Sequence, residues 1–255
     1  MRNLLFIALS IAFVSCESQP ELLFEEQFDG ASLNMDTWNY ELGDGCPNLC
    51  GWGNNERQIY TEKNVRLDDG HLVITATRDS SLYESGRITT KNKFEFQYGT
   101  IEVRAQLPEG HGLWPAVWML GNDIDTNTWP GCGEIDIMEY VGREPHTIYT
   151  SLHTPDSFGN TINSKKTVLE NIEEGFHIYK AHWTKDTIKF YIDDVLVYDF
   201  SPSLKNDKTW PFDKPFYLLL NMAIGGNFGG PEVDDSIFPQ EFIIDYVKIY
   251  KPKNS

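Results

Sequence analysis

The sequence predicts an all-β fold, a β-jelly-roll sandwich of two curved antiparallel sheets. Short apolar runs follow one another along the 255 residues, separated by clusters of Gly, Asn, Asp and Pro. Several runs alternate between apolar and polar residues, as half-buried strands do. No stretch gives a convincing amphipathic helix. Two stacked sheets that curve leave one concave face, and a long polymer can lie in such a cleft.

Eight runs are the clearest strand candidates. In chain order they cover residues 71–77, 93–107, 114–120, 134–140, 147–153, 187–200, 216–223 and 242–250. In the sixth run Asp193 and Asp194 separate two alternating segments, which predicts a tight hairpin turn. Residues 168–174 are the one segment with the composition of a helical turn.

The first fifteen residues resemble an export signal. Arg2 supplies a positive charge, and the apolar run over residues 4–14 is too short to span a bilayer. Ser15-Cys16 resembles the cleavage box of a bacterial lipoprotein, with Cys16 as the lipidated residue. Plain secretion is the alternative, because Phe13 stands where Leu is usual. We therefore expect a signal peptide (1–15), a short tether (16–21) and one domain (22–252), placed at the outer membrane or cell surface or secreted.

Charge and cysteine content restrict the class of partner. The net charge of −17 argues against nucleic acid and polyanionic substrates, because both would be repelled. In an oxidising compartment Cys46 and Cys50 are expected to form a disulfide, which leaves Cys132 as a free, buried thiol. The seven Trp residues can fill a core, and they can also stack on sugar rings.

Three acidic residues on one predicted strand carry the chemistry. Glu134 and Asp136 are two residues apart and project from one face, whereas Glu139 points the other way on a regular strand. One β-bulge at Ile137 or Met138 restores the parity. A glycosidase needs such a cluster, because one carboxylate attacks the anomeric carbon and another donates a proton to the leaving oxygen. In isolation the motif also fits a solvated acidic strand or part of a calcium site.

The surrounding blocks make the pattern specific. Residues 134–139 closely resemble the signature of glycoside hydrolase family 16, in the bulged form of laminarinases (endo-β-1,3-glucanases). The similarity extends over about residues 23–250. The supporting blocks are residues 51–56, 86–88, 98–106, 112–120, 221–230 and 245–250.

That resemblance implies an endo-acting retaining hydrolase of β-1,3-glucan that needs no cofactor for catalysis and works as a monomer. Glu134 corresponds to the nucleophile and Glu139 to the acid/base. Asp136 lies between them and hydrogen-bonds the nucleophile. Burial and the neighbouring carboxylates are expected to raise the pKa of Glu139, as an acid catalyst requires.

The resemblance also implies a set of substrate-binding residues. They are Asn55, Arg87, Trp114, Trp118, His153, Asn221 and Phe228. Trp114 and Trp118 correspond to cleft residues that stack on glucose, whereas Arg87 and Asn55 correspond to residues that bind hydroxyls on the non-reducing side. Asn54 is a rival for Asn55, because neighbouring strand residues face opposite ways.

Family members often carry a structural Ca²⁺ on the convex side. The corresponding ligands are Gln27, the Gly70 carbonyl and Asp245, and calcium prefers such oxygen ligands. The family often has Glu where Gln27 stands.

Other substrates and one other class remain open. Mixed-linkage β-1,3-1,4-glucan is a second candidate substrate. The extra residue Met138 disfavours the unbulged lichenase branch, and the negative charge disfavours sulfated galactans. A non-catalytic carbohydrate-binding jelly roll is the alternative outside enzymes, although it has no reason to keep three acids together.

Overall fold

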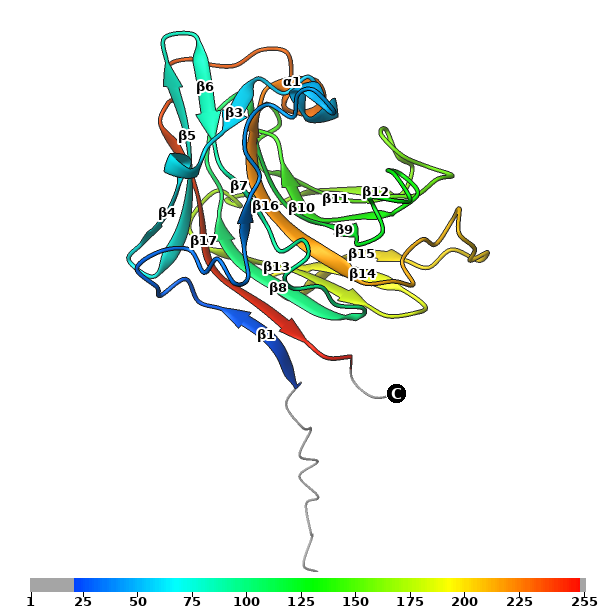
Figure 1. The fold of residues 1–255 in the computed structure, drawn as a ribbon. Helices are drawn as coiled ribbons and strands as arrows, with labels where there is room; N and C mark the ends of the chain where they lie inside the picture. Colours follow the sequence, from blue (N-terminus) through cyan, green and yellow to red (C-terminus); the bar gives the residue numbers. More distant parts are fainter. Residues whose placement is uncertain (1–20, 253–255) are drawn as a thin grey trace, which may run out of the picture.

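The protein is described from a computed structural model, which covers residues 21–252. Two β-sheets stack face to face and curve together (Figure 1). Within these residues no helix is long and apolar enough to cross a bilayer. The short helical elements are η1 (Cys50–Gly53), η2 (Glu62–Asn64) and α1 (Gly226–Gly229).

The seven-stranded sheet carries the concave face. Its strands, in spatial order, are β12 (Ser164–Val168), β11 (Thr147–His153), β10 (Glu134–Tyr140), β9 (Leu113–Gly121), β16 (Phe216–Ile224), β7 (Arg87–Thr89) and β2 (Asn39–Tyr40). Neighbouring strands are antiparallel throughout. β10, which carries the acidic motif, therefore lies inside the sheet with β9 and β11 on either side.

The ten-stranded sheet covers the other side. Along its main path lie β15 (Val195–Phe200), β14 (Ile188–Ile192), β13 (His177–Trp183), β8 (Gly99–Gln106), β17 (Gln240–Tyr250), β5 (His71–Asp79), β6 (Leu82–Ser85) and β3 (Gln58–Tyr60). β1 (Leu22–Glu26) pairs with β17, and β4 (Val65–Asp68) pairs with β5. The β3–β6 pair is parallel, and the others are antiparallel.

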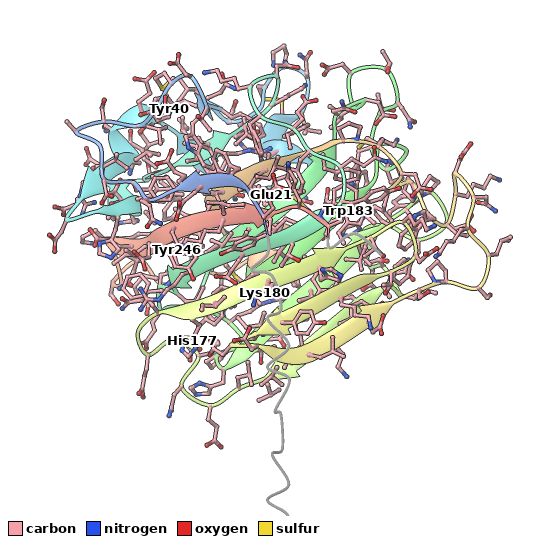
Figure 2. The ribbon with its side chains drawn as sticks, turned by 90° about the horizontal axis from the view of Figure 1, so that it is seen from below. Glu21, Tyr40, His177, Lys180, Trp183 and Tyr246 are labelled. Atoms are coloured by element: carbon pink, nitrogen blue, oxygen red, sulfur yellow. A yellow bond between two sulfur atoms is a disulfide. The ribbon has the colours of Figure 1, made fainter. Side chains whose placement is uncertain are left out.

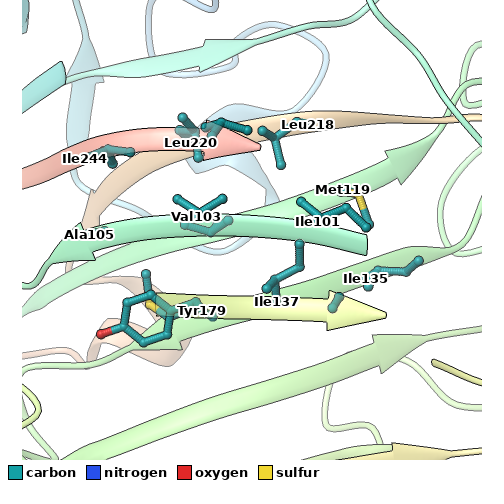
Figure 3. Packing of buried hydrophobic residues seen from close by; sticks show 14 of the residues in the cluster. Ile101, Val103, Ala105, Met119, Ile135, Ile137, Tyr179, Leu218, Leu220 and Ile244 are labelled. Carbon is teal, nitrogen blue, oxygen red and sulfur yellow. The ribbon is translucent and has the colours of Figure 1, made fainter. Parts of the chain in front are cut away.

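The core fills the space between the sheets. Ile101 and Val103 of β8 face Ile135 and Ile137 of β10, and Leu220 of β16 packs into the same cluster (Figure 3). Residues of β8 alternate between buried and partly exposed along its whole length, as a strand with one core face must. Burying a side chain of this kind contributes about 1.5–3 kcal/mol. The core thus fixes which face of β10 is left for the cleft.

The outer face of the ten-stranded sheet is polar. Tyr246 donates a hydrogen bond to Glu102 at 2.8 Å, and the Lys180 ammonium lies 3.1 Å from the same carboxylate. Figure 2 shows this face, with Lys180 and Tyr246 labelled. These partly exposed groups are thus partnered with one another.

The predicted elements are largely confirmed. All eight runs contain strands, and the Asp193-Asp194 turn has positive φ at both residues (46° and 66°), as a type I′ hairpin requires. The second run begins only at Gly99, because the left-handed backbone of Tyr98 (φ 61°) interrupts the extended conformation. Residues 168–174 form no helix, since Val168 ends β12 and turn residues follow.

The cysteine predictions are confirmed as well. Cys46 and Cys50 form a disulfide, and Cys132 is a buried free thiol. The predicted signal peptide and Cys16 lie outside the described residues, as does most of the tether.

Candidate active site

A β-bulge in β10 brings the three acids to one face. On β11, the partners of Asp136 and Glu139 are Ser151 and Tyr149, so three residues of β10 span the length of two on its neighbour. The pairing with β9 slips in the same place. Ile137 and Met138 both point into the core as a result. The bulge predicted from the spacing of the acids is therefore confirmed.

The three carboxylates lie close to aromatic and imidazole donors. His153 Nε2 is 3.5 Å from Glu134 Oε1 and 3.2 Å from Asp136 Oδ2. Glu134 and Asp136 also share a side-chain hydrogen bond. Trp114 Nε1 donates to Glu139 Oε1 at 3.1 Å. Asp136 and Glu139 are only 3% and 9% exposed, so these few contacts must replace most of their hydration.

Burial raises the pKa of all three carboxyl groups. It raises the pKa of Glu134 to about 8, helped by the charge of Asp136 and opposed by His153. Burial, followed by the charges of Asp136 and Glu134, holds the pKa of Glu139 well above its usual range. Like charges this close cannot all ionise together. The cluster therefore keeps protons at neutral pH, and it holds both an acid and a potential nucleophile.

Further polar and aromatic side chains of the same sheet come from β9 and β7. Trp114 and Trp118 both point out of the core on β9, as their even spacing predicted. The Arg87 guanidinium lies between two indoles, with its carbon 4.9 Å from the Trp118 ring centroid and 4.3 Å from that of Trp52. Arg87 is also paired with Glu41. The Arg87 guanidinium is thus held in place between the Trp52 and Trp118 rings.

Asn221 contacts Trp118, one of these two rings. Its Oδ1 accepts a hydrogen bond from Trp118 Nε1 at 2.7 Å, and its Nδ2 donates to the Tyr60 hydroxyl at 3.0 Å. The Tyr60 hydroxyl in turn donates to Glu56 at 3.2 Å. Both polar ends of the Asn221 side chain are therefore engaged within the protein. Asn221 therefore orients Trp118, and its direct contact with sugar stays a prediction.

The other predicted binding residues line the rim around α1. Phe228 packs edge-to-face against Trp114, with ring centroids 5.3 Å apart, and against Tyr149 at 5.0 Å. Asn55 is exposed and donates to Asn227 at 2.8 Å. Its rival Asn54 turns toward Glu56 instead. Of the two asparagines, Asn55 is the more exposed.

Several cleft residues were not predicted from the sequence. Trp52 lies within residues 51–56, one of the blocks that resemble the family, but it belongs to no alternating or helical pattern. Trp129 comes from the loop before β10, where its ring centroid lies 5.8 Å from that of His153 and its indole hydrogen-bonds Glu134. Trp52 belongs to η1 and Trp129 to a loop, so only the folded chain shows that Trp52 reaches Arg87 and that Trp129 reaches the acids.

Comparison with known proteins agrees with this geometry. Residues 53–246 match the model of the glycosyl hydrolases family 16. The chain belongs to this family. A laminarinase from Flavobacterium sp. UMI-01 shares 60% identity and a TM-score of 0.89, over 91% of this chain and all of that structure. The β-glucanase of Rhodothermus marinus is 36% identical over 91% of this chain and 85% of its own length.

One relative is much longer than this chain. The glucan endo-1,3-beta-glucosidase A1 of Niallia circulans is 38% identical over 90% of this chain, which spans only 38% of that protein. The family 16 match confirms the prediction of a glycoside hydrolase with a jelly-roll fold. The acidic cluster lies on the strand where the family signature was found.

One group of side chains in this family 16 domain has the spacing of a cation site. Within residues 21–252, the group of acids and histidine able to hold an ion is the active-site set Glu134, Asp136 and His153, whose ligand atoms lie within 4.8 Å of one another. These three residues belong to the acidic cluster described above. It lies on the opposite sheet from the residues predicted to bind calcium.

The predicted calcium ligands are arranged differently. Gln27 follows β1, Gly70 lies in the turn between β4 and β5, and Asp245 lies on β17. The Asp245 carboxylate forms an ion pair with Arg104 and lies 3.8 Å from His71 Nε2. A bound Ca²⁺ would compete with Arg104 for this carboxylate. The calcium site stays a prediction.

Proposed function

We propose that this chain is an endo-acting retaining hydrolase of β-1,3-glucan, with mixed-linkage β-1,3-1,4-glucan as a second substrate. The bulge that gathers Glu134, Asp136 and Glu139 on one face is the observation that carries the proposal. The 60% identity to a laminarinase over the full length of that structure supports the choice of glucan.

In the first step, the Glu134 carboxylate attacks the anomeric carbon while Glu139 donates its proton to the glycosidic oxygen. The bond to the leaving sugar breaks, and a covalent glycosyl-enzyme forms. Glu139 is then ionised and takes a proton from a water molecule, whose oxygen attacks the anomeric carbon and releases Glu134. Two inversions give net retention, so the new reducing end is first a β-anomer.

Asp136 and His153 adjust the charge of the nucleophile. A proton shared between Glu134 and Asp136 leaves Glu134 ionised whenever it resides on Asp136, which then donates the hydrogen bond. His153 stabilises the negative charge on either carboxylate. Glu139, whose pKa burial holds well above its ordinary value, keeps the proton that the first step consumes.

The cleft side chains support a substrate that curls. A β-1,3-glucan chain turns from unit to unit, whereas a β-1,4 chain is straight. Trp114 and Phe228 present ring planes at 85° to each other, which one straight chain cannot stack on together. Polar groups such as Arg87 and Asn55 add selectivity, because a wrong substrate leaves them unpaired.

Substrate profiling tests this proposal. We expect kcat/KM on laminarin at least about tenfold above that on lichenan, with no action on cellulose, agarose or carrageenan. Trp114→Ala should weaken laminarin cleavage without unfolding the protein. Trp114→Phe should retain more activity than Trp114→Ala, because it keeps an aromatic ring while losing the N–H donor to Glu139 and part of the stacking area. Proton NMR should show the β-anomer first. Equal efficiency on lichenan, activity confined to a galactan, or an α-anomer would each contradict the proposal.

The proposal extends to location and assembly. The pattern of residues 1–16 supports export and a lipid anchor on Cys16, with ordinary secretion as the alternative. The expected form is a monomer whose partner is the polysaccharide. Labelled fatty acid should enter the wild type and not Cys16→Ala. Unlabelled, soluble wild type in the medium would mean plain secretion.

A further inference from the structure

The loop between β11 and β12 displays an aromatic side chain that the mechanism does not use. Phe158 is 50% exposed and lies in residues 154–163, directly after His153 at the end of β11. Its ring packs edge-to-face on Trp129, with centroids 5.4 Å apart and planes at 82°. Trp129, itself 40% exposed, contacts His153. An aromatic path therefore runs from the acidic cluster outward to Phe158.

The loop that carries Phe158 is held together by its own hydrogen bonds. The Ser157 hydroxyl bonds to that of Thr161 at 2.9 Å and accepts from the backbone N–H of Ile162 at 2.9 Å. Thr161 in turn donates to the carbonyl of Leu152 on β11 at 3.0 Å. Phe158 is thus presented to solvent by an ordered turn, and little conformational entropy is lost when a ligand contacts it.

The position of this loop defines which part of a substrate it can meet. Arg87, Trp118 and Asn221 belong to β7, β9 and β16, all on one side of β10, whereas Phe158 follows β11 on the other side. A glucan lying across β10 therefore meets Arg87 with one half and Phe158 with the other. If Arg87 contacts the non-reducing half, as the family resemblance implies, Phe158 faces the half that leaves.

We propose that Phe158 is a specificity-determining residue that binds the leaving half of the glucan, beyond the first sugar after the cleaved bond. This proposal rests on the proposed function. Trp129 lies nearer the acids and meets the first leaving sugar, and the perpendicular Phe158 ring meets the next one. The planes of the Trp129 and Phe158 rings differ by 82°, which suits a glucan chain that changes direction from one sugar to the next.

The test measures where a short substrate is cut. Wild type, Phe158→Ala and Phe158→Tyr are given laminaripentaose in ¹⁸O-labelled water, and mass spectrometry assigns each cut from the labelled new reducing end. In Phe158→Ala, cuts that leave two or more glucose units on the leaving side should slow by about 2- to 10-fold. Cuts that leave one unit should keep the wild-type rate. Phe158→Tyr should restore the wild-type pattern, because it keeps the ring.

Ile162→Ala provides the matched control, since Ile162 is 87% exposed in the same loop and carries no ring. A cutting pattern in Phe158→Ala equal to that of Ile162→Ala overturns the proposal. So does an equal slowing of all cuts, which would show only a disturbed His153. A wild type that cuts laminaripentaose while Phe158→Ala is unchanged refutes this proposal alone. A wild type that does not cut it refutes the proposed function as well.

Discussion

The two faces of β10 are buried to a similar depth and have opposite energetic consequences. On the core face, Ile135 and Ile137 are at most 1% exposed and gain free energy from leaving water. On the cleft face, Asp136 and Glu139 are nearly as buried, yet burial opposes their ionisation and raises their pKa values. The core face of β10 thus stabilises the fold, whereas its cleft face carries buried carboxyl groups with raised pKa values.

The bulge makes this division possible. It turns two successive apolar residues, Ile137 and Met138, into the core, so that Glu139 returns to the face of Glu134. Without the extra residue, this sequence would place one acid in the core. The apolar core face stabilises the fold, which offsets the destabilising burial of the carboxyl groups on the cleft face.

The largest expected effect comes from removing Glu134, the proposed nucleophile, on the cleft face. Glu134→Ser should lower kcat on laminarin by at least about a thousandfold, because no covalent intermediate can form. Binding of laminari-oligosaccharides, measured by calorimetry, should remain close to that of the wild type. Glu170→Ser is the control, since Glu170 is an exposed acid on a turn. Residual activity of Glu134→Ser within tenfold of wild type would remove Glu134 from its role.

A substitution on the core face should act on stability instead. Ile137→Ala leaves a cavity between the sheets and should lower the free energy of unfolding by about 2–5 kcal/mol. Thermal unfolding measures the loss, which corresponds to roughly 2–4 °C per kcal/mol for a domain of this size. Ile162→Ala, at an exposed site, should change stability by less than about 0.5 kcal/mol. Equal stability of the two variants would mean that the bulge does not pack as described.

The smallest expected effect has the opposite sign. The pKa of Glu139 is raised in the folded state, so above pH 4.5 the unfolded chain binds fewer protons there and folding loses stability as pH rises. Glu139→Gln removes this penalty and should stabilise the protein by about 0.5–2 kcal/mol at pH 8 while abolishing activity. The gain should vanish toward pH 4, where both states are protonated. A gain that is independent of pH would contradict the assigned cause.

The sequence was most informative where a pattern repeats along the chain. The alternation of apolar and polar residues predicts the strands around the core. The spacing of Glu134, Asp136 and Glu139 predicts the bulge, which the pairing of β10 with β11 confirms. It was least informative where contacts are made by loops. Trp52 and Trp129 reach the cleft through segments without periodicity, and no local pattern reports such contacts. Asn221 shows a further limit, because its residue type suits a sugar hydroxyl as well as the Trp118 indole that it binds.

The central position of β17 has a consequence for how the chain folds. This strand, at residues 240–250, pairs with β1 at residues 22–26 and also with β5 and β8, so the ten-stranded sheet stays divided until it arrives. Its contacts span almost the whole described chain, and closing loops of that length makes folding slow. During synthesis, the early strands must therefore wait with open edges for the end of the domain.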